Sequence, residues 1–161
     1  MVDLDSIDRR ILRHLQADGR MSVASLADAV GLTPTPLRSR LDKLRQRGVL
    51  LGVHGRVDAV QVGQGALAFI HVTLRDHSRT SHERFVDGVT AMPEVLEVHH
   101  IAGEEDFLLK VVGRDLAAFE SFLLERLTPI ESISRIKTTF VLSSAKKAAP
   151  IPIPDCDQEV T

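Results

Sequence analysis

The chain has 161 residues, 43% of them hydrophobic and 26% charged, with a formal net charge of −2 at pH 7. These are the proportions of a globular chain with a buried core, and they exclude a protein that is disordered throughout. No apolar run approaches the roughly 20 residues that span a bilayer, and the first residues lack the basic-then-apolar order of a signal peptide, so we expect a cytoplasmic protein without a membrane partner.

The first part of the chain carries the spacing of short helices. Apolar residues recur at helical spacing after Asp5, which suits an N-cap, until Asp18 and Gly19 end the pattern. Ser22 is expected to cap a second helix that ends at Gly31, and only a tight turn separates it from the next helical stretch. Because so short a turn makes two helices cross steeply, the segment is predicted to be a helix-turn-helix unit.

The third helical stretch is expected to begin at Pro34, behind a Thr33 cap, and to end at Gly48. Leucines recur at positions 37, 41 and 44, which places them on one face. The other positions between 38 and 47 include five basic residues and one acidic residue. One face is thus packed and the other basic, as in a helix that enters the major groove of DNA, although an ordinary surface helix has the same pattern.

Charge is divided unevenly along the chain. Residues 1–58 hold ten Lys or Arg and seven Asp or Glu, a balance of +3, whereas residues 59–161 hold ten and fifteen, a balance of −5. The N-terminal part therefore offers nucleic acid a positive local field although the whole protein is slightly acidic.

Four segments are predicted from these patterns. After Gly48 the sequence is rich in Val with Gly interruptions, which indicates a wing or hinge strand. We expect a helix-turn-helix domain with this strand at 1–58, a linker at 59–65, a second domain at 66–143 and an extended tail at 144–161.

The second domain is predicted to alternate strands and helices. Strands are expected at 66–75, 95–102, 107–113 and 133–142. One helix is expected to start at a capping box of Thr80 and Glu83, and another after Asp115. The order β-α-β-β-α-β is that of a ferredoxin-like domain, and the fold class of the chain is α+β. Because both helices would cover one sheet face, a second copy is expected to bury the other face in a homodimer.

The C-terminal tail alternates Pro and Ile between Pro150 and Pro154, which excludes a helix. It is expected to be either a free end or an extended arm that lies on a neighbour. The only cysteine, Cys156, can neither close an internal disulfide nor supply a metal cluster, which agrees with a reducing compartment.

The chain resembles the Lrp/AsnC family, the leucine-responsive and asparagine-operon transcriptional regulators, over nearly its whole length. The resemblance is carried by L-D-S-I-D-R-R-I-L at 4–12, D-G-R at 18–20, G-L-T-P-T-P-L-R-S-R-L-D-K-L at 31–44, R-G-V-L at 47–50 and G-E-E-D-F-L-L-K at 103–110. It implies a winged helix-turn-helix followed by a ferredoxin-like (RAM) domain. It also implies a nucleoid-associated regulator that binds double-stranded DNA, dimers that assemble into a tetramer or octamer, and an amino-acid effector near the turn at 103–106.

If the third helix enters the major groove, its N-terminal half meets base edges and its other polar groups meet phosphates. The residues expected nearest the bases are Thr33, Thr35, Pro36, Arg38, Ser39 and Asp42. The residues expected to contact phosphate are Ser22, Lys43, Arg45 and Arg47. Arg38 suits a guanine, whereas Asp42 is expected to pair with neighbouring cations, and a structural ion-pairing role stays open for Arg40. The chain contains no Asn, so recognition is expected to depend on DNA bending as well.

The turn at 103–106 is the second candidate site. Gly103 lets a backbone approach a ligand, and Asp106 with Glu104 supplies negative charge for an α-ammonium group. His100, just before the turn, is a further candidate for effector binding. A solvent-exposed hairpin turn is the alternative interpretation. His99 and His100 point to opposite faces of a strand and cannot share a metal, so neither a metal nor a cofactor is expected.

Two other functions remain open. An enzyme on the ferredoxin-like scaffold lacks support, because acyl-phosphate hydrolysis would need an Asn and because capping explains the group of Ser78, Ser81 and His82. An architectural DNA-compacting protein without an effector would have the same DNA site and would differ only at the turn.

Overall fold

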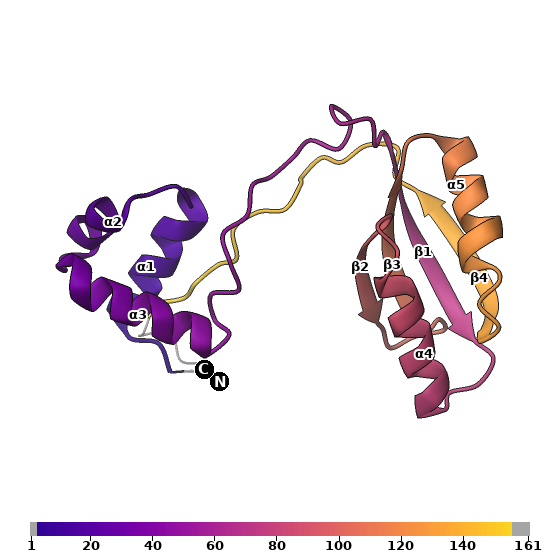
Figure 1. The fold of residues 1–161 in the computed structure, drawn as a ribbon, viewed down its shortest axis with the longest axis horizontal. Coiled ribbons are helices and arrows are strands. Elements are labelled where there is room, and N and C mark those ends of the chain that lie inside the picture. Colours follow the sequence, from indigo (N-terminus) through magenta and orange to yellow (C-terminus); the bar gives the residue numbers. More distant parts are fainter. Residues whose placement is uncertain (1–2, 156–161) are drawn as a thin grey trace. The chain divides into compact units, whose positions relative to one another are not determined.

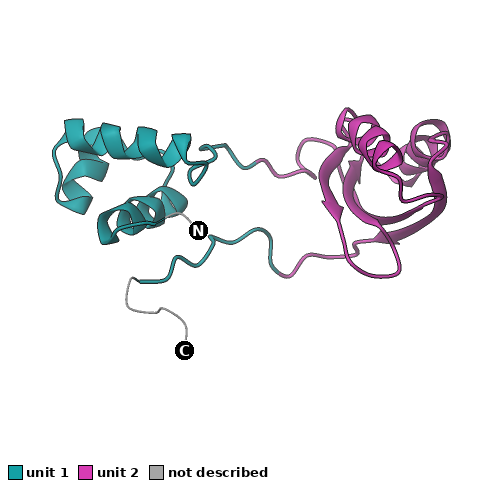
Figure 2. Ribbon diagram, turned by 90° about the horizontal axis from the view of Figure 1, so that it is seen from below, with its two compact units in different colours: residues 1–56, 146–161 teal, residues 57–145 magenta. Residues whose placement is uncertain are grey.

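The computed structural model describes residues 3–155, so Cys156 lies outside the described part of the chain. The chain forms two compact units (Figures 1 and 2). Unit 1 contains residues 1–56 and 146–161, and unit 2 contains residues 57–145. The C-terminal tail is therefore part of the N-terminal unit. Among the described residues, no helix combines the length and the apolar character needed to cross a membrane.

Unit 1 is a bundle of three helices, α1 (Ser6–Ala17), α2 (Val23–Val30) and α3 (Pro34–Gln46). Two predicted caps are confirmed: the Asp5 carboxylate accepts a hydrogen bond from the Asp8 N–H at 2.8 Å, and Ser22 Oγ accepts one from the Ser25 N–H at 3.0 Å. Gly31 ends α2 in the left-handed conformation, with φ of 72°. These local signals position α2 and α3 across a short turn, as the sequence predicts.

The predicted Thr33 cap does not form, because the Thr33 side chain makes no capping hydrogen bond. Pro34 and Pro36 hold the first and third positions of α3, and neither has an N–H to donate. The fixed φ of proline starts this helix without a side-chain cap. At the other end, Gly48 has φ of 68°, in agreement with the predicted end of the helix.

The predicted wing strand does not form within the described single chain. Val49 and Leu50 donate backbone hydrogen bonds to the Leu44 carbonyl and complete the end of α3, but residues 51–58 belong to no strand of the described chain. A strand needs a neighbour for its backbone groups, and the described residues supply none beside this glycine-interrupted segment. The boundary between the units falls after Arg56 rather than after residue 58.

Unit 2 has the predicted β-α-β-β-α-β order. Its elements are β1 (Ala66–Leu74), α4 (Arg79–Thr90), β2 (Val95–His100), β3 (Phe107–Gly113), α5 (Leu116–Phe122), a π-helical turn (Leu123–Leu127) and β4 (Ile133–Phe140). The antiparallel sheet has the strand order β2-β3-β1-β4. The cap of α4 is Ser78, which accepts from the Ser81 N–H, and not Thr80 as predicted.

The two faces of the sheet differ. Both helices lie on one side of it (Figures 1 and 2), where paired residues such as Ile70 and Leu109 are fully buried. The opposite side, which we call the open face, carries the intervening pairs, such as Phe69 with Lys110, and these are only half-buried. The sequence alternates between the two faces along β1 and β3, as expected for a sheet whose second face is covered by less protein.

Candidate nucleic-acid interface and ligand-binding turn

Helix α3 has three faces, because successive residues advance by about 100°. The buried face holds the three leucines at 37, 41 and 44. What we call the outer face consists of Thr35, Arg38, Asp42 and Arg45. What we call the groove face consists of Pro36, Ser39, Arg40, Lys43 and Arg47. Apart from the half-buried Arg40, every residue of the outer and groove faces is exposed, so all predicted base-contacting residues of α3 are accessible.

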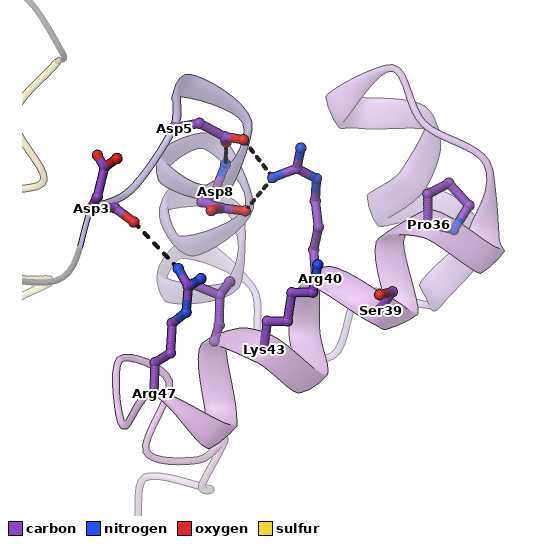
Figure 3. Close-up of a pocket in the computed structure, with 9 residues that line it drawn as sticks. Asp3, Asp5, Asp8, Pro36, Ser39, Arg40, Lys43 and Arg47 are labelled. Carbon is purple, nitrogen blue, oxygen red and sulfur yellow. Dashed lines mark hydrogen bonds and ion pairs between the residues drawn. The ribbon is translucent and has the colours of Figure 1, made fainter.

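The groove face lies opposite the acidic start of α1 (Figure 3). Arg40 Nη1 joins the two helices, with distances of 2.6 Å to Asp5 Oδ2 and 2.7 Å to Asp8 Oδ1. The Arg40 side chain is 30% exposed and the Asp8 side chain 12% exposed, so solvent screens this contact incompletely. Arg40 therefore forms the structural ion pairs that the sequence analysis left open as one of its roles.

The ion pair also changes the acidity of its members. Burial opposes ionisation of Asp5, but hydrogen bonds from the Asp8 N–H and from Arg40 outweigh it, so the pKa of Asp5 lies below its usual value of 3.8. The carboxylates of Asp8 and Asp5 together raise the pKa of Arg40. The ion pairs join the start of α1 to the middle of α3.

Two other cations of the groove face differ in their contacts. Arg47 Nη1 lies 3.5 Å from the carbonyl oxygen of Asp3 (Figure 3), at the limit of a hydrogen bond. The Lys43 ammonium group makes no hydrogen bond or ion pair within residues 3–155. Aspartates stand beside both cations, so a phosphate that binds on the groove face competes with acids of the protein itself.

The outer face has fewer internal contacts. The side chains of Arg38 and Thr35 make no hydrogen bond or ion pair to any other described residue. Arg45 Nη1 lies 3.1 Å from Asp42 Oδ1, which confirms the predicted pairing of Asp42 with a neighbouring cation. Ser22 is exposed at the start of α2, where its hydroxyl also contacts the Ser25 hydroxyl at 2.8 Å. Arg38 is thus the cation of the outer face whose donors are all available to an external partner.

In unit 2, the turn after β2 is organised by Asp106. Its Oδ2 accepts the Leu74 N–H at 2.7 Å, its own N–H donates to the Val72 carbonyl at 3.0 Å, and its Oδ1 lies 3.4 Å from His77 Nδ1. The Asp106 side chain is only 16% exposed. This carboxylate joins the end of β1 to the start of β3, a structural use that the sequence did not indicate.

Glu105 is a residue of the turn that was not among the predicted site residues. Its side chain is 17% exposed and faces two groups, His71 Nδ1 at 3.9 Å and Lys137 Nζ at 3.7 Å. The His71 Nδ1 atom is buried without a hydrogen-bond partner among the described residues. His71 and Lys137 are paired across β1 and β4. The sequence does not reveal this long-range pairing, and for that reason Glu105 was not predicted as a site residue.

His100 lies on the helix-covered face, where its ring stacks on Phe107 with 5.0 Å between centroids. The His82 ring from α4 meets His100 edge-on, also at 5.0 Å, and the His77 ring lies 6.4 Å from His82. His99 lies on the open face with Glu97, so the two adjacent histidines do point apart. Within the described part of the chain, no group of three or more His, Cys, Asp or Glu side chains has a metal-binding arrangement.

Gly103 and Glu104 form the exposed tip of the turn. A Cβ atom added to Gly103 would meet nothing within 4 Å, so in the single chain no close packing requires a glycine there. The turn therefore has an open tip with Gly103 and Glu104, a base in which Asp106 and Glu105 are engaged, and a histidine cluster beside it.

Two family models match the chain. Residues 4–45 match the AsnC-type helix-turn-helix domain, and residues 67–151 match the Lrp/AsnC ligand binding domain. Among individual relatives, the leucine-responsive regulatory protein of Rhizobium meliloti is 36% identical over 94% of this chain and 97% of its own length. The DNA-binding transcriptional activator DecR of Escherichia coli K12 is 36% identical over 93% of this chain and 99% of its own length.

Solved structures match both units. A transcriptional regulator from Neisseria meningitidis, crystallised as a complex with L-Met, has a TM-score of 0.85 and 32% identity over 93% of this chain and 97% of its own. Escherichia coli AsnC has a TM-score of 0.82 and 26% identity over 92% of this chain and 98% of its own.

Proposed function

The chain belongs to the Lrp/AsnC family of transcriptional regulators, and from this premise we propose that it binds operator DNA through α3 and responds to an amino acid bound at the turn of unit 2. One observation carries the DNA part. Helix α3 is held by buried leucines and by the Arg40 ion pairs, while the outer face presents Arg38 with all its donors available. A rigid helix with free donors is what base recognition requires.

Within this proposal, the residues of α3 divide their work. Arg38 donates two hydrogen bonds to a guanine, and Thr35 or Pro36 gives an apolar contact to a thymine methyl group. Thr33 and Ser39 hydroxyls are the remaining base-proximal groups. Phosphates are bound by Ser22, Lys43, Arg45 and Arg47, which give affinity without sequence information.

The amino acid binds at the tip of the turn. The relative from Neisseria meningitidis was crystallised with L-Met, which supports an α-amino acid as the class of effector. Glu104 is exposed and offers its carboxylate to the α-ammonium group, and Gly103 leaves space for a ligand to approach the backbone. Asp106 and His100 complete the predicted site, with Asp106 holding the turn in shape.

Self-association completes the proposal. The open face carries half-buried apolar residues, including Phe69 and Leu108, beside the ion pair of Lys110 Nζ with Glu97 Oε1 at 2.7 Å. A homodimer through this face would remove the apolar groups from water. Such dimers assemble further into a tetramer or octamer and place two copies of α3 on a pseudo-palindromic operator.

A gel-shift assay of the purified protein on the DNA upstream of its own gene, with each amino acid added in turn, tests this function. We expect a shift on that DNA that one or a few amino acids strengthen or weaken. A thermal-shift screen with the same amino acids distinguishes a regulator with an effector from an architectural DNA-compacting protein without one, because a ligand that binds only the folded state raises the melting temperature. If no amino acid changes either readout, the effector part of the proposal is wrong.

A further inference from the structure

Unit 1 has a groove on α1 that lies apart from the proposed DNA-contacting residues, and the C-terminal tail forms one of its walls. The space that remains in the groove has a volume of about 680 Å³, and its walls are α1, the segment that follows α3 (residues 49–54) and residues 151–154 of the tail. Ile153 of the tail packs against the hydrophobic core of unit 1, whereas the neighbouring Ile151 is 75% exposed. A single side chain therefore anchors the tail in the apolar part of the groove.

Arginines of α1 hold the tail at this anchor and just after it. Arg9 Nη1 donates to the Pro154 carbonyl at 2.8 Å, and Arg13 Nη2 donates to the Ile153 carbonyl at 2.8 Å. Arg13 also forms an ion pair with the Asp155 carboxylate. The two arginines lie four residues apart and so project from the same side of α1.

Gln16 extends this row of donors by one further turn of α1. Its Nε2 donates to the Ile151 carbonyl at 3.0 Å, and its Oε1 accepts the Ile151 N–H at 2.7 Å. The side-chain amide thus pairs with one residue of the tail in the way that a neighbouring β-strand would. Together with the arginines, it satisfies three carbonyl groups of five consecutive tail residues.

The sequence of the tail fits this form of recognition. Residues 150, 152 and 154 are prolines, which have no N–H and which hold the chain extended before it binds. An extended segment of this kind loses little conformational entropy on docking and offers carbonyl groups rather than N–H groups. The donors of α1 are therefore matched to a proline-alternating segment.

We propose that this groove is a docking site for the chain's own C-terminal tail and that the docked tail supports the end of α3. Val49 and Leu50, in the wall of the groove, hydrogen-bond to the Leu44 carbonyl at 2.9 and 3.1 Å. Undocking of the tail exposes this wall and loosens the last turn of α3. Since the tail follows β4, unit 1 is joined to unit 2 by two chain segments rather than one. This inference goes beyond the proposed regulator function and requires neither DNA nor an amino acid.

Hydrogen exchange of the full-length chain, read by mass spectrometry, tests the proposal. Residues 150–154 contain only two backbone amides, those of Ile151 and Ile153, because the other three residues are prolines. We expect exchange in this segment to be at least about tenfold slower than in a free peptide of the same sequence. Ile153→Asp should abolish that protection and accelerate exchange at residues 49–50.

Ile151→Ser is the matched control, because this side chain is exposed, and it should keep the protection. Gln16→Leu is a second variant that leaves the anchor in place: it removes the acceptor of the Ile151 N–H and should leave exchange at residues 49–50 unchanged. Unchanged exchange in β1 and β3 shows that unit 2 is intact in every variant. The proposal is overturned if the wild-type tail exchanges at the rate of the free peptide, or if Ile153→Asp keeps the wild-type protection.

Discussion

The outer face of α3 and the turn of unit 2 differ in how much of their polar chemistry the protein already uses. The side chains of Arg38 and Thr35 have no hydrogen bond or ion pair within residues 3–155, on a helix fixed by contacts from its other faces. Asp106 and Glu105 are both engaged with groups of β1, β4 or the loop after β1. The outer face of α3 can therefore bind DNA without breaking internal contacts. A ligand of the turn must either bind at its exposed tip or displace the groups that Asp106 and Glu105 already contact.

The largest effect is expected on the outer face. Arg38→Ala removes two donors that only DNA would use, so it should lower affinity by about 1 to 3 kcal/mol for each base pair that Arg38 contacts. Binding to the operator and to single-base variants of it, measured at fixed salt, gives this value. Folding stability should not change, because Arg38 has no partner among the described residues. Equal losses on operator and random DNA would contradict the assignment.

Asp106→Ala tests the opposite situation, because its carboxylate is already used inside the chain. Loss of the acceptor for the Leu74 N–H should destabilise unit 2 by roughly 1 to 3 kcal/mol and abolish the amino-acid response. Asp106→Asn keeps an acceptor oxygen but loses the charge. Thermal unfolding and effector titration of both variants separate the two roles. If the Asn variant responds to the amino acid like the wild type, the charge of Asp106 has no part in effector binding.

Arg40→Met should behave unlike Arg38→Ala although the two arginines are neighbours on one helix. The substitution leaves Asp5 and Asp8 without their cation and should lower the free energy of unfolding of unit 1 by about 1.5 kcal/mol. This value is at the low end of the range for hydrogen bonds between charged groups, because the Asp5 side chain is half exposed. Denaturant unfolding measures this loss. A stability equal to that of the wild type would show that the contact contributes nothing.

The pH dependence of unit 1 follows from the same contact. Folding lowers the pKa of Asp5, so its carboxylate stabilises the fold above the unfolded value of 3.8, and this contribution disappears as the pH falls through the lowered value. Asp5→Asn keeps an N-cap acceptor but has no such titration. The variant should be less stable than the wild type at pH 7, and the two should converge in acid. A difference that stays constant with pH would contradict the ion-pair explanation.

The smallest effect is expected at Lys43, on the groove face. Lys43→Ala should weaken operator and random DNA alike and lower the slope of log affinity against log salt by about 1, because one phosphate contact is lost. Asp3, Asp5 and Asp8 line the same pocket as this residue, and their competition with phosphate would make the change in slope smaller. A loss confined to particular base pairs would instead place Lys43 at the bases.

Local signals in the sequence predicted most of the fold. The caps at Asp5 and Ser22 and the helix end at Gly31 depend on neighbours within a few residues, and all three are confirmed. The cap of α4 was misplaced by two residues, because Asp76, whose carboxylate accepts from the Ser78 N–H and the Ser81 hydroxyl, organises that turn.

The contacts that the sequence did not predict have a different origin. The use of Asp106 by β1, the position of Glu105 between His71 and Lys137, and the docking of the tail on α1 all join residues far apart in sequence. No local pattern reports such contacts. The predicted wing strand does not form in the single chain for the same reason, because a strand requires a hydrogen-bonding partner that its own sequence does not specify.

Hydroxyl-radical footprinting on the DNA upstream of the protein's own gene tests the central claim, that the outer face of α3 recognises an operator, most directly. We expect protected half-sites spaced near multiples of one helical turn, and loss of protection at particular base pairs in each half-site for Arg38→Ala. A single unrepeated site, or a footprint that Arg38→Ala leaves unchanged, would contradict it.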